Sequence, residues 1–187
     1  DSITGTEILQ FFTNASAATI DGIELESAFT FANWYVNVNA SYLDAAYDDF
    51  MGNAVTPFVG ERAVDRSGEP FFTTPELTWS LSAYYKLMTS VGMFIPRFSL
   101  SYRDEVFTGL DFLADSFDNA TVDEVTLLDA RLLYQPSEKV QITAYVENVT
   151  DEVYYTSGFS NSGALGAGLM INGKPRTFGL EVSVEFY

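Results

Sequence analysis

The sequence contains no cysteine and no histidine in its 187 residues. Without these residues it cannot form a disulfide framework, a thiol nucleophile, a Ser-His-Asp triad or an ordinary zinc site. Most hydrolase and metalloenzyme classes are therefore excluded. We expect a protein that is not an enzyme and that carries no cofactor.

Positive charge is also scarce, with nine Lys and Arg residues against 26 Asp and Glu residues and a net charge of −17. Nucleic-acid binding is excluded on this ground, because a phosphate backbone needs many basic side chains. No apolar run approaches the ~18 residues of a membrane-spanning helix. If the chain crosses a bilayer, it must do so with strands.

Apolar residues recur at every second position in the last segment, "PRTFGLEVSVEFY". A period of two predicts an extended strand with one apolar face and one wet face. The apolar positions of this segment are Phe178, Leu180, Val182, Val184 and Phe186.

The same alternation marks further strands along the chain. Together with the terminal strand they give roughly eight, an even number as in most outer-membrane barrels. Most keep their alternation for about ten residues, the length of a tilted spanning strand, whereas strands of soluble sandwiches are usually about 5–6 residues long. Pro96 should weaken its strand locally, because proline has no backbone donor. The predicted strands are 6–13, 23–32, 36–43, 77–87, 94–103, 128–134, 140–147 and 177–186.

Short and long connections alternate between these strands. Tight turns are predicted at Asn33–Trp34, Met88–Ser90 and Pro136–Lys139. Bacterial outer-membrane barrels have short periplasmic turns and long outer loops. The sequence therefore predicts an all-β, antiparallel transmembrane β-barrel. The predicted outer loops are about 48–75, 104–121 and 150–174.

Within the strands, the charged residues alternate with the apolar positions and therefore lie on the opposite face. A charge on the lipid side near the midplane costs about 2–4 kcal/mol, less for acids, so we expect these residues to face the barrel lumen. We expect Glu24 and Glu26 to pair with Arg97, Arg103 or Arg131. The predicted lumen-facing residues are Glu24, Glu26, Arg97, Arg103, Asp129, Arg131, Glu147 and Glu181. Aromatic girdles at the membrane borders are expected from Trp34, Tyr35, Trp79, Tyr134 and Tyr154.

The loops offer weaker candidates for binding. Asp111, Asp115 and Asp118 are oxygen donors suited to Ca²⁺, but they lack the spacing of a calcium loop, so a solvated acidic loop is preferred and no metal site is predicted. Loop position alone favours a group of aromatic and basic residues as ligand contacts. These are Arg62, Arg66, Phe71, Phe107 and Tyr155.

Three segments resemble the C-terminal barrel region of TonB-dependent outer-membrane receptors. They are "TIDGIELE" at 19–26, "VENVTDEVYY" at 146–155 and "GKPRTFGLEVSVEF" at 173–186. Their order and spacing agree with the family over nearly the whole chain. The closing strand resembles the signal by which such barrels are recognised for assembly, although Tyr187 follows the phenylalanine at which the family normally stops. The residues matching this signal are Gly179, Leu180, Val182, Val184 and Phe186.

The resemblance implies a chain that is part of a larger receptor. Full receptors have a barrel of roughly 22 strands around a plug, so residues 1–187 would supply about a third of the barrel and no plug domain. The implied function is energy-coupled uptake of a scarce ligand across the outer membrane of a Gram-negative bacterium. A ferric siderophore is expected, with cobalamin or an oligosaccharide as further options.

Four kinds of partner follow from the resemblance. They are outer-membrane lipid and lipopolysaccharide, the remaining plug and N-terminal strands of the same receptor, the TonB complex reached through the missing N-terminal part, and the barrel-assembly machinery.

Two alternatives stay open at this point. One is an independent eight-stranded outer-membrane barrel with a structural or pore role. The other is an acidic soluble β-sandwich that binds carbohydrate.

Overall fold

The computed structural model describes residues 17–56, 60–108, 121–161 and 167–186. All regular structure in these ranges is antiparallel β-strand, as predicted. No helix in the described ranges is long and apolar enough to cross a membrane.

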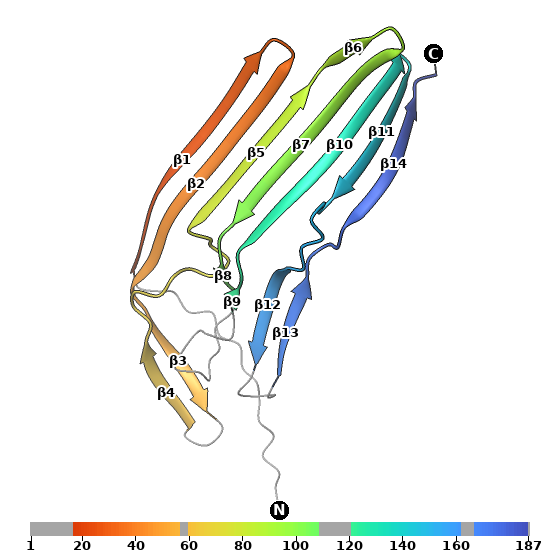
Figure 1. Cartoon of the computed structure of the whole chain (residues 1–187). Helices are drawn as coiled ribbons and strands as arrows, with labels where there is room; N and C mark the ends of the chain where they lie inside the picture. The colour runs from red at the N-terminus through yellow and green to blue at the C-terminus, as the bar shows by residue number, and fades with distance from the viewer. Residues whose placement is uncertain (1–16, 57–59, 109–120, 162–166, 187) are drawn as a thin grey trace, which may run out of the picture.

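Seven long strands and one short strand form the main sheet (Figure 1). The short strand, β6 (Leu87–Thr89), pairs with β7. The predicted strand 6–13 lies outside the described residues, and β6 is the eighth member of this sheet instead. In spatial order the long strands are β1 (Ala17–Phe31), β2 (Trp34–Asp49), β5 (Leu77–Tyr85), β7 (Gly92–Arg103), β10 (Val125–Ser137), β11 (Val140–Glu147) and β14 (Thr177–Val184).

Three small two-stranded sheets lie within the regions predicted as long loops. Figure 1 shows them at one end of the main sheet, whereas the tight turns and the C-terminus lie at the other end. The connections therefore alternate as expected, but the long ones contain more regular structure than a plain loop. The pairs are β3 (Met51–Thr56) with β4 (Gly60–Asp65), β8 (Val106–Phe107) with β9 (Thr121–Val122), and β12 (Tyr155–Asn161) with β13 (Ala167–Asn172).

The first tight turn is formed by Ala32 and Asn33, because Trp34 already pairs with Phe31. The predicted turn at Asn33–Trp34 is therefore wrong by one residue. Ala32 has a φ of +52°, the left-handed conformation that lets a two-residue turn match the twist of its strands.

Pro96 interrupts its strand pairing as expected. β5 pairs with β7 as far as Tyr84 opposite Arg97, and β6 resumes in the same register with Leu87 opposite Phe94. On the other side of this segment, the amide of Lys86 donates to the Asn33 carbonyl and continues the β2–β5 register. Proline offers no donor at this point, which explains why one long strand is divided into β5 and β6.

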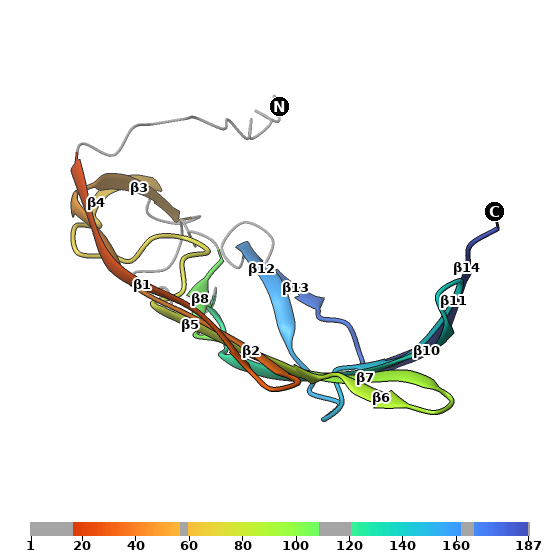
Figure 2. The same cartoon turned by 90° about the horizontal axis from the view of Figure 1, so that it is seen from above.

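The main sheet is a single curved layer, and Figure 2 shows the β12–β13 hairpin on its concave side. Only four apolar residues in the described ranges are buried. A soluble β-sandwich needs a second sheet packed on the first, so that alternative is wrong. The edge strands β1 and β14 do not pair within the described residues, so an independent closed barrel is not formed by them either.

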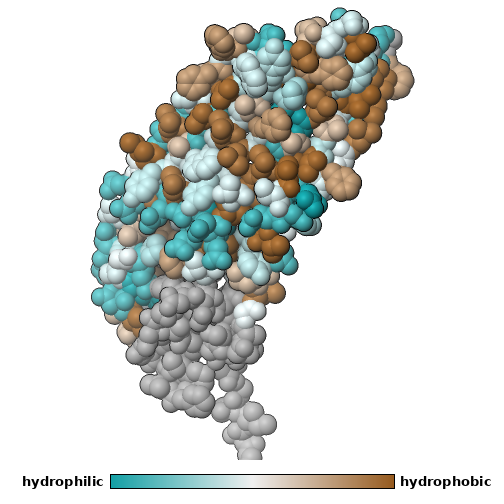
Figure 3. Space-filling model, in the orientation of Figure 1, coloured by the Kyte–Doolittle hydropathy of each residue, from teal (hydrophilic) through white to brown (hydrophobic). Residues whose placement is uncertain are grey.

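The cross-strand register places the predicted apolar positions of all the long strands on the same face of the sheet. One row runs across all seven long strands, and its members are directly paired. These side chains are open to the surroundings, with Phe178 78% exposed. Apolar side chains cover much of the sheet in Figure 3, while polar ones gather toward the hairpin end. The row consists of Phe29, Val36, Ala83, Phe98, Ala130, Val146 and Phe178.

Candidate functional site: the concave polar face

The face opposite to this apolar row carries all eight predicted lumen-facing residues. Arg97 pairs with Arg131, and Asp129 pairs with Ser99, which places these groups on one face. Arg103 identifies this face as the concave one. Its Nη2 donates to the Tyr155 carbonyl at 3.5 Å, and Tyr155 belongs to the hairpin on the concave side in Figure 2.

A hollow of about 280 Å³ lies between β7 and β10 on the concave face. It is lined by Arg97, Ser99, Asp129 and Arg131. Nη2 of Arg131 lies 3.4 Å from a Glu147 oxygen, and its guanidinium carbon lies 5.6 Å from the Tyr145 ring centroid. The hollow is therefore a polar site with an excess of guanidinium groups.

Glu147 has a second partner that the sequence did not indicate. Nζ of Lys174, from the link between β13 and β14, lies 2.8 Å from the other Glu147 oxygen. This hydrogen bond, together with the Glu147 charge, raises the pKa of the Lys174 amine above its ordinary value. Glu24 and Glu26 lie on β1, three strands away from β7, and make no ion pair with described residues. The expected pairing of these two acids with an arginine is wrong for this part of the chain.

Asn148 organises the link between β11 and β12, and only 4% of it is exposed. Its backbone amide donates to Asp129 Oδ1 at 2.9 Å. Its Nδ2 donates to the Glu152 carbonyl at 2.9 Å and to the Lys174 carbonyl at 3.2 Å, while its Oδ1 accepts from the Glu152 amide at 2.9 Å. Through its backbone amide and its side chain, this one residue therefore joins the sheet to both links that lead into the β12–β13 hairpin.

A second contact joins the same two links. Asp151 accepts a hydrogen bond from the Arg176 amide at 3.2 Å, and its carboxylate lies 3.3 Å from the Arg176 guanidinium. Asn148 and Asp151 both have positive φ, at +53° and +59°. The segments "VENVTDEVYY" and "GKPRTFGLEVSVEF" thus meet in space, which was not apparent from their separation in the sequence.

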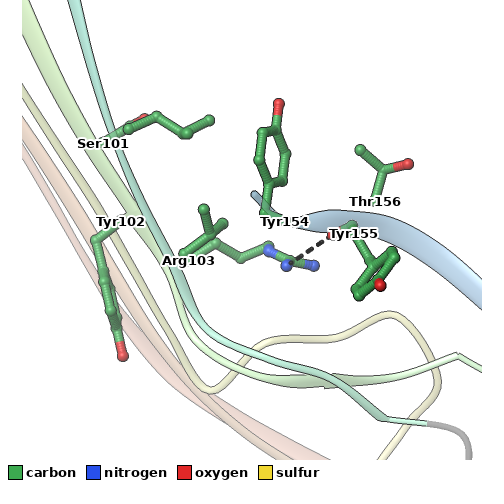
Figure 4. Close-up of a pocket in the computed structure, with 8 residues that line it drawn as sticks. Ser101, Tyr102, Arg103, Tyr154, Tyr155 and Thr156 are labelled. Carbon is green, nitrogen blue, oxygen red and sulfur yellow. Dashed lines mark hydrogen bonds between the residues drawn. The ribbon is translucent and has the colours of Figure 1, made fainter. Parts of the chain in front are cut away.

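A second hollow of about 280 Å³ lies between the sheet and the hairpin. Figure 4 shows Arg103 directed toward Tyr155, while Tyr102 points away to the other face of the sheet. The Arg103 Nη2 also donates to the Asp123 carbonyl at 3.0 Å, so the guanidinium holds two loop carbonyls. The lining residues are Ser101, Tyr102, Arg103, Val125, Leu127, Tyr154, Tyr155 and Thr156.

The predicted ligand contacts do not all share one place. Tyr155, 36% exposed, borders the second hollow. Phe71 packs on Tyr47 with ring centroids 4.5 Å apart. Arg66 is only 3% exposed and forms an ion pair of 3.4 Å with Glu69, so its side chain serves the base of the β3–β4 hairpin.

The remaining loop candidates can be placed only in part. Arg62 lies on β4 opposite Ala54, and Phe107 lies on β8 opposite Thr121. The calcium candidates Asp111, Asp115 and Asp118 lie outside the described residues. Within the described ranges, no group of three or more acidic residues could hold a metal ion.

The residues that match the assembly signal lie on or directly after β14. Leu180, Val182 and Val184 are exposed on the apolar face, and Phe186 follows the end of the strand. Gly179 lies on the concave face opposite Tyr145. β14 pairs only with β11 among the described strands, so its other edge offers free backbone groups.

Aromatic pairs mark two levels on the apolar face. Trp34 and Tyr85, with ring centroids 4.9 Å apart, lie near the tight turns. Trp79 and Tyr102, 5.8 Å apart, lie toward the hairpin end. Such belts are typical of the two membrane borders.

Two of the expected girdle residues are placed elsewhere. Tyr35 lies on the concave face, where it stacks on Tyr84 at 4.6 Å. Tyr154 belongs to the link after β11 and covers Gly173.

A family model for the β-barrel of TonB dependent receptor-like proteins matches residues 1–149. A curated pesticin receptor of Yersinia pestis is 26% identical over 184 residues, which cover 96% of this chain and 24% of that protein. The pesticin receptor of a Yersinia enterocolitica strain is 25% identical over the same shares of the two chains. The chain thus spans about a quarter of the length of these curated relatives.

Solved structures show the same fold. The crystal structure of the ferric yersiniabactin uptake receptor FyuA from Yersinia pestis matches with a TM-score of 0.70 and 21% identity. That match covers 91% of this chain and 24% of the other. The siderophore receptor PiuA from Acinetobacter baumannii matches with a TM-score of 0.67 and 19% identity, over 89% of this chain and 22% of that one.

Proposed function

The chain belongs to the family of TonB-dependent receptor-like β-barrels, and we propose that it forms the C-terminal wall of an outer-membrane receptor for ferric siderophores. In this proposal β1 to β14 supply about a third of a barrel of roughly 22 strands, and the three hairpin regions supply outer loops. The family consists of receptors and transporters, so the role is binding and passage of a ligand without covalent chemistry.

The single observation that supports a place in the barrel wall is that one curved sheet has an apolar face and a charged face. Seven strands present a continuous apolar row on one side and the charged residues on the other. Backbone groups in a bilayer must all be paired, which favours a closed barrel whose outer face is apolar. The edges of β1 and β14 would then pair with strands from the rest of the receptor.

The ligand class is supported by the relatives. One similar structure is a receptor for ferric yersiniabactin and another is a siderophore receptor. The concave face is locally basic where Arg97, Arg103 and Arg131 lie on β7 and β10, although most of its acidic residues lie on other strands. An anionic chelate could therefore pass along this face despite the net charge of −17.

Energy coupling, the plug and the barrel-assembly machinery enter the proposal as partners of the complete receptor. Lipid and lipopolysaccharide would contact the apolar face between the two aromatic levels. The rest of the same polypeptide would contact the concave face.

Uptake by the full-length receptor tests the function. A strain that lacks the gene would be compared with one that expresses it, using radioactive iron carried by a panel of siderophores, with labelled cobalamin and a labelled oligosaccharide as alternatives. We expect iron uptake from at least one siderophore, lost when the proton gradient is dissipated. Uptake of only cobalamin or oligosaccharide would refute the ligand class, and detergent-free solubility of the full-length protein would refute the barrel.

A further inference from the structure

Arg103 is the last residue of β7 and lies between two of the hairpin regions. One nitrogen of its guanidinium, Nη2, donates to the Asp123 carbonyl at 3.0 Å and to the Tyr155 carbonyl at 3.5 Å. Asp123 lies between β9 and β10, and Tyr155 is the first residue of β12. One side chain of the main sheet is therefore bonded to the base of the β8–β9 pair and to the base of the β12–β13 hairpin.

Both acceptors are backbone carbonyls, so the contact does not depend on the side chains at positions 123 and 155. An arginine suits this position because its planar guanidinium is always charged and presents several donors in a fixed geometry. Hydrogen bonds from a charged donor are also stronger than those between neutral groups. Arg103 is thus the side chain on which this double contact depends.

The β8–β9 pair also meets the β12–β13 hairpin directly. A Cβ atom added to Gly158, in β12, would lie 3.1 Å from Oγ1 of Thr108, the residue that follows β8. Gly158 is buried, so the two segments approach closely where the glycine has no side chain. The same two structures are therefore joined at two places, once through Arg103 and once by direct contact.

The β8–β9 pair rests on a small apolar core. Val106 and Val122 pair across it and are 4% and 0% exposed. Val125, at the start of β10, is 8% exposed and lines the hollow between the sheet and the hairpin. These are three of the four buried apolar residues in the described ranges. Because packed interiors resist deformation, the pair is a firm support for a neighbouring hairpin.

We propose that Arg103 is a positioning residue that joins the β8–β9 pair and the β12–β13 hairpin into one body. Surface connections are otherwise among the least stable parts of a fold and open locally. The inference rests on the proposed function, in which both structures are outer loops. Tyr155 borders the second hollow, so Arg103 would fix the place of a candidate ligand contact before a ligand arrives.

Hydrogen exchange of the full-length receptor without ligand, measured by mass spectrometry, tests the contact. Arg103→Met keeps the apolar stem of the side chain and removes its donors. We expect exchange to rise about tenfold in residues 121–124 and in residues 154–158, as for the loss of a charged hydrogen bond. Arg103→Lys retains a charged donor and should rescue much of this protection. Arg97→Met, on the same strand and face, is the matched control and should leave both segments unchanged.

An engineered disulfide tests whether the two structures act as one body. Residues 1–187 contain no cysteine, so Thr108→Cys together with Gly158→Cys introduces a single pair into this part of the receptor. The close approach of these two positions suits a disulfide. In the Arg103→Met background we expect the oxidised pair to return exchange in both segments toward the wild-type value, and reduction to raise it again. Heat-modifiable gel mobility would confirm that each variant is folded.

Several results would overturn the proposal. They are unchanged exchange in Arg103→Met, a rise in only one of the two segments, equal exchange in Arg103→Lys and Arg103→Met, a cysteine pair that does not form a disulfide, and a disulfide that forms without restoring both segments. None of these measurements uses a ligand. A receptor that shows the coupled exchange but imports no siderophore would therefore refute the proposed function and retain the role of Arg103.

Discussion

Tyr145 covers Gly179 across the β11–β14 pair, so that a Cβ added to the glycine would lie 2.5 Å from the tyrosine hydroxyl oxygen. The ring fills the space that the missing side chain leaves, as in other sheets where an aromatic residue shields a glycine of the neighbouring strand. This contact lies within the segment that resembles the assembly signal. The backbone of Gly179 is not in the left-handed conformation, so the turn geometry does not require a glycine here. The glycine is needed for the close packing of the Tyr145 ring.

Replacement of Gly179 should disturb this contact. We expect Gly179→Val to destabilise the β11–β14 pair by about 1–3 kcal/mol, because the added methyl groups and the Tyr145 ring would overlap. Urea unfolding of the detergent-solubilised receptor, followed by heat-modifiable mobility, measures the change. In the background Tyr145→Ala the same substitution should cost clearly less, and an equal cost in both backgrounds would contradict the contact.

Asn148 should control the order of the β12–β13 hairpin. Asn148→Ala removes the bonds to Glu152 and Lys174, and each buried group left without a partner costs about 1–3 kcal/mol. We expect faster hydrogen exchange in residues 150–176, measured by mass spectrometry. Asn148→Gly keeps the positive φ accessible and serves as the control for backbone strain. If the glycine variant retains wild-type exchange, the side-chain bonds are not what orders the hairpin.

A charged side chain should destabilise the receptor much more at one of two neighbouring positions of β5 than at the other. Leu81 lies on the apolar face and is 40% exposed, whereas Ser80 lies on the concave face opposite Asn39. We expect Leu81→Arg to destabilise the folded receptor by about 2–4 kcal/mol, since it lies between the two aromatic levels. Ser80→Arg should have a much smaller effect. Equal losses in urea stability at both positions would contradict the assignment of faces.

The base of the β3–β4 hairpin should be best protected in a narrow acidic range. Hydrogen bonds from the Ser67 hydroxyl and amide lower the pKa of Asp65 below its ordinary 3.8, so this stabilisation is lost as pH falls below that value. Burial raises the pKa of Glu69 above its ordinary 4.5, although Arg66 opposes the shift. Protonated Glu69 is therefore favoured in the folded hairpin, and stability declines as pH rises above 4.5.

Hydrogen exchange of residues 50–71, corrected for its intrinsic pH dependence, measures this behaviour. We expect protection to be greatest near about pH 4, between the two transitions. Glu69→Gln should remove the decline on the alkaline side and leave the acid side unchanged. Asp65→Asn should remove the loss on the acid side and weaken the decline on the alkaline side, because the Asp65 charge contributes to the raised pKa of Glu69. A wild-type profile that rises steadily from pH 3 to pH 6 would contradict the opposite shifts.

The long strands could be predicted from the sequence because their alternation is a local property. Val36 and Phe98 each lie in a run with a period of two, and cross-strand pairing then preserves the faces of the whole sheet. The same rule applied to neighbours shows why Tyr35 cannot join Trp34 in a girdle. Adjacent residues of a strand point to opposite faces.

The site could be predicted only in part, because its contacts join distant segments. Asn148 donates a hydrogen bond to the Lys174 carbonyl, and Glu147 forms ion pairs with both Arg131 and Lys174. Nothing in the local pattern indicates these partners. The hairpins were also missed, since "MGNAVT" and "YTSGFSN" are short and have little apolar alternation.

The sheet has almost no interior of its own, and this makes its stability a property of the medium. Phe98 and Leu180 are 57% and 69% exposed, and in the proposed membrane placement acyl chains would supply their contacts in place of other parts of the fold. The thickness of the surrounding lipid should then act on the receptor as core volume acts on a water-soluble protein. Shortening or lengthening the acyl chains would strain the strands without changing a single residue.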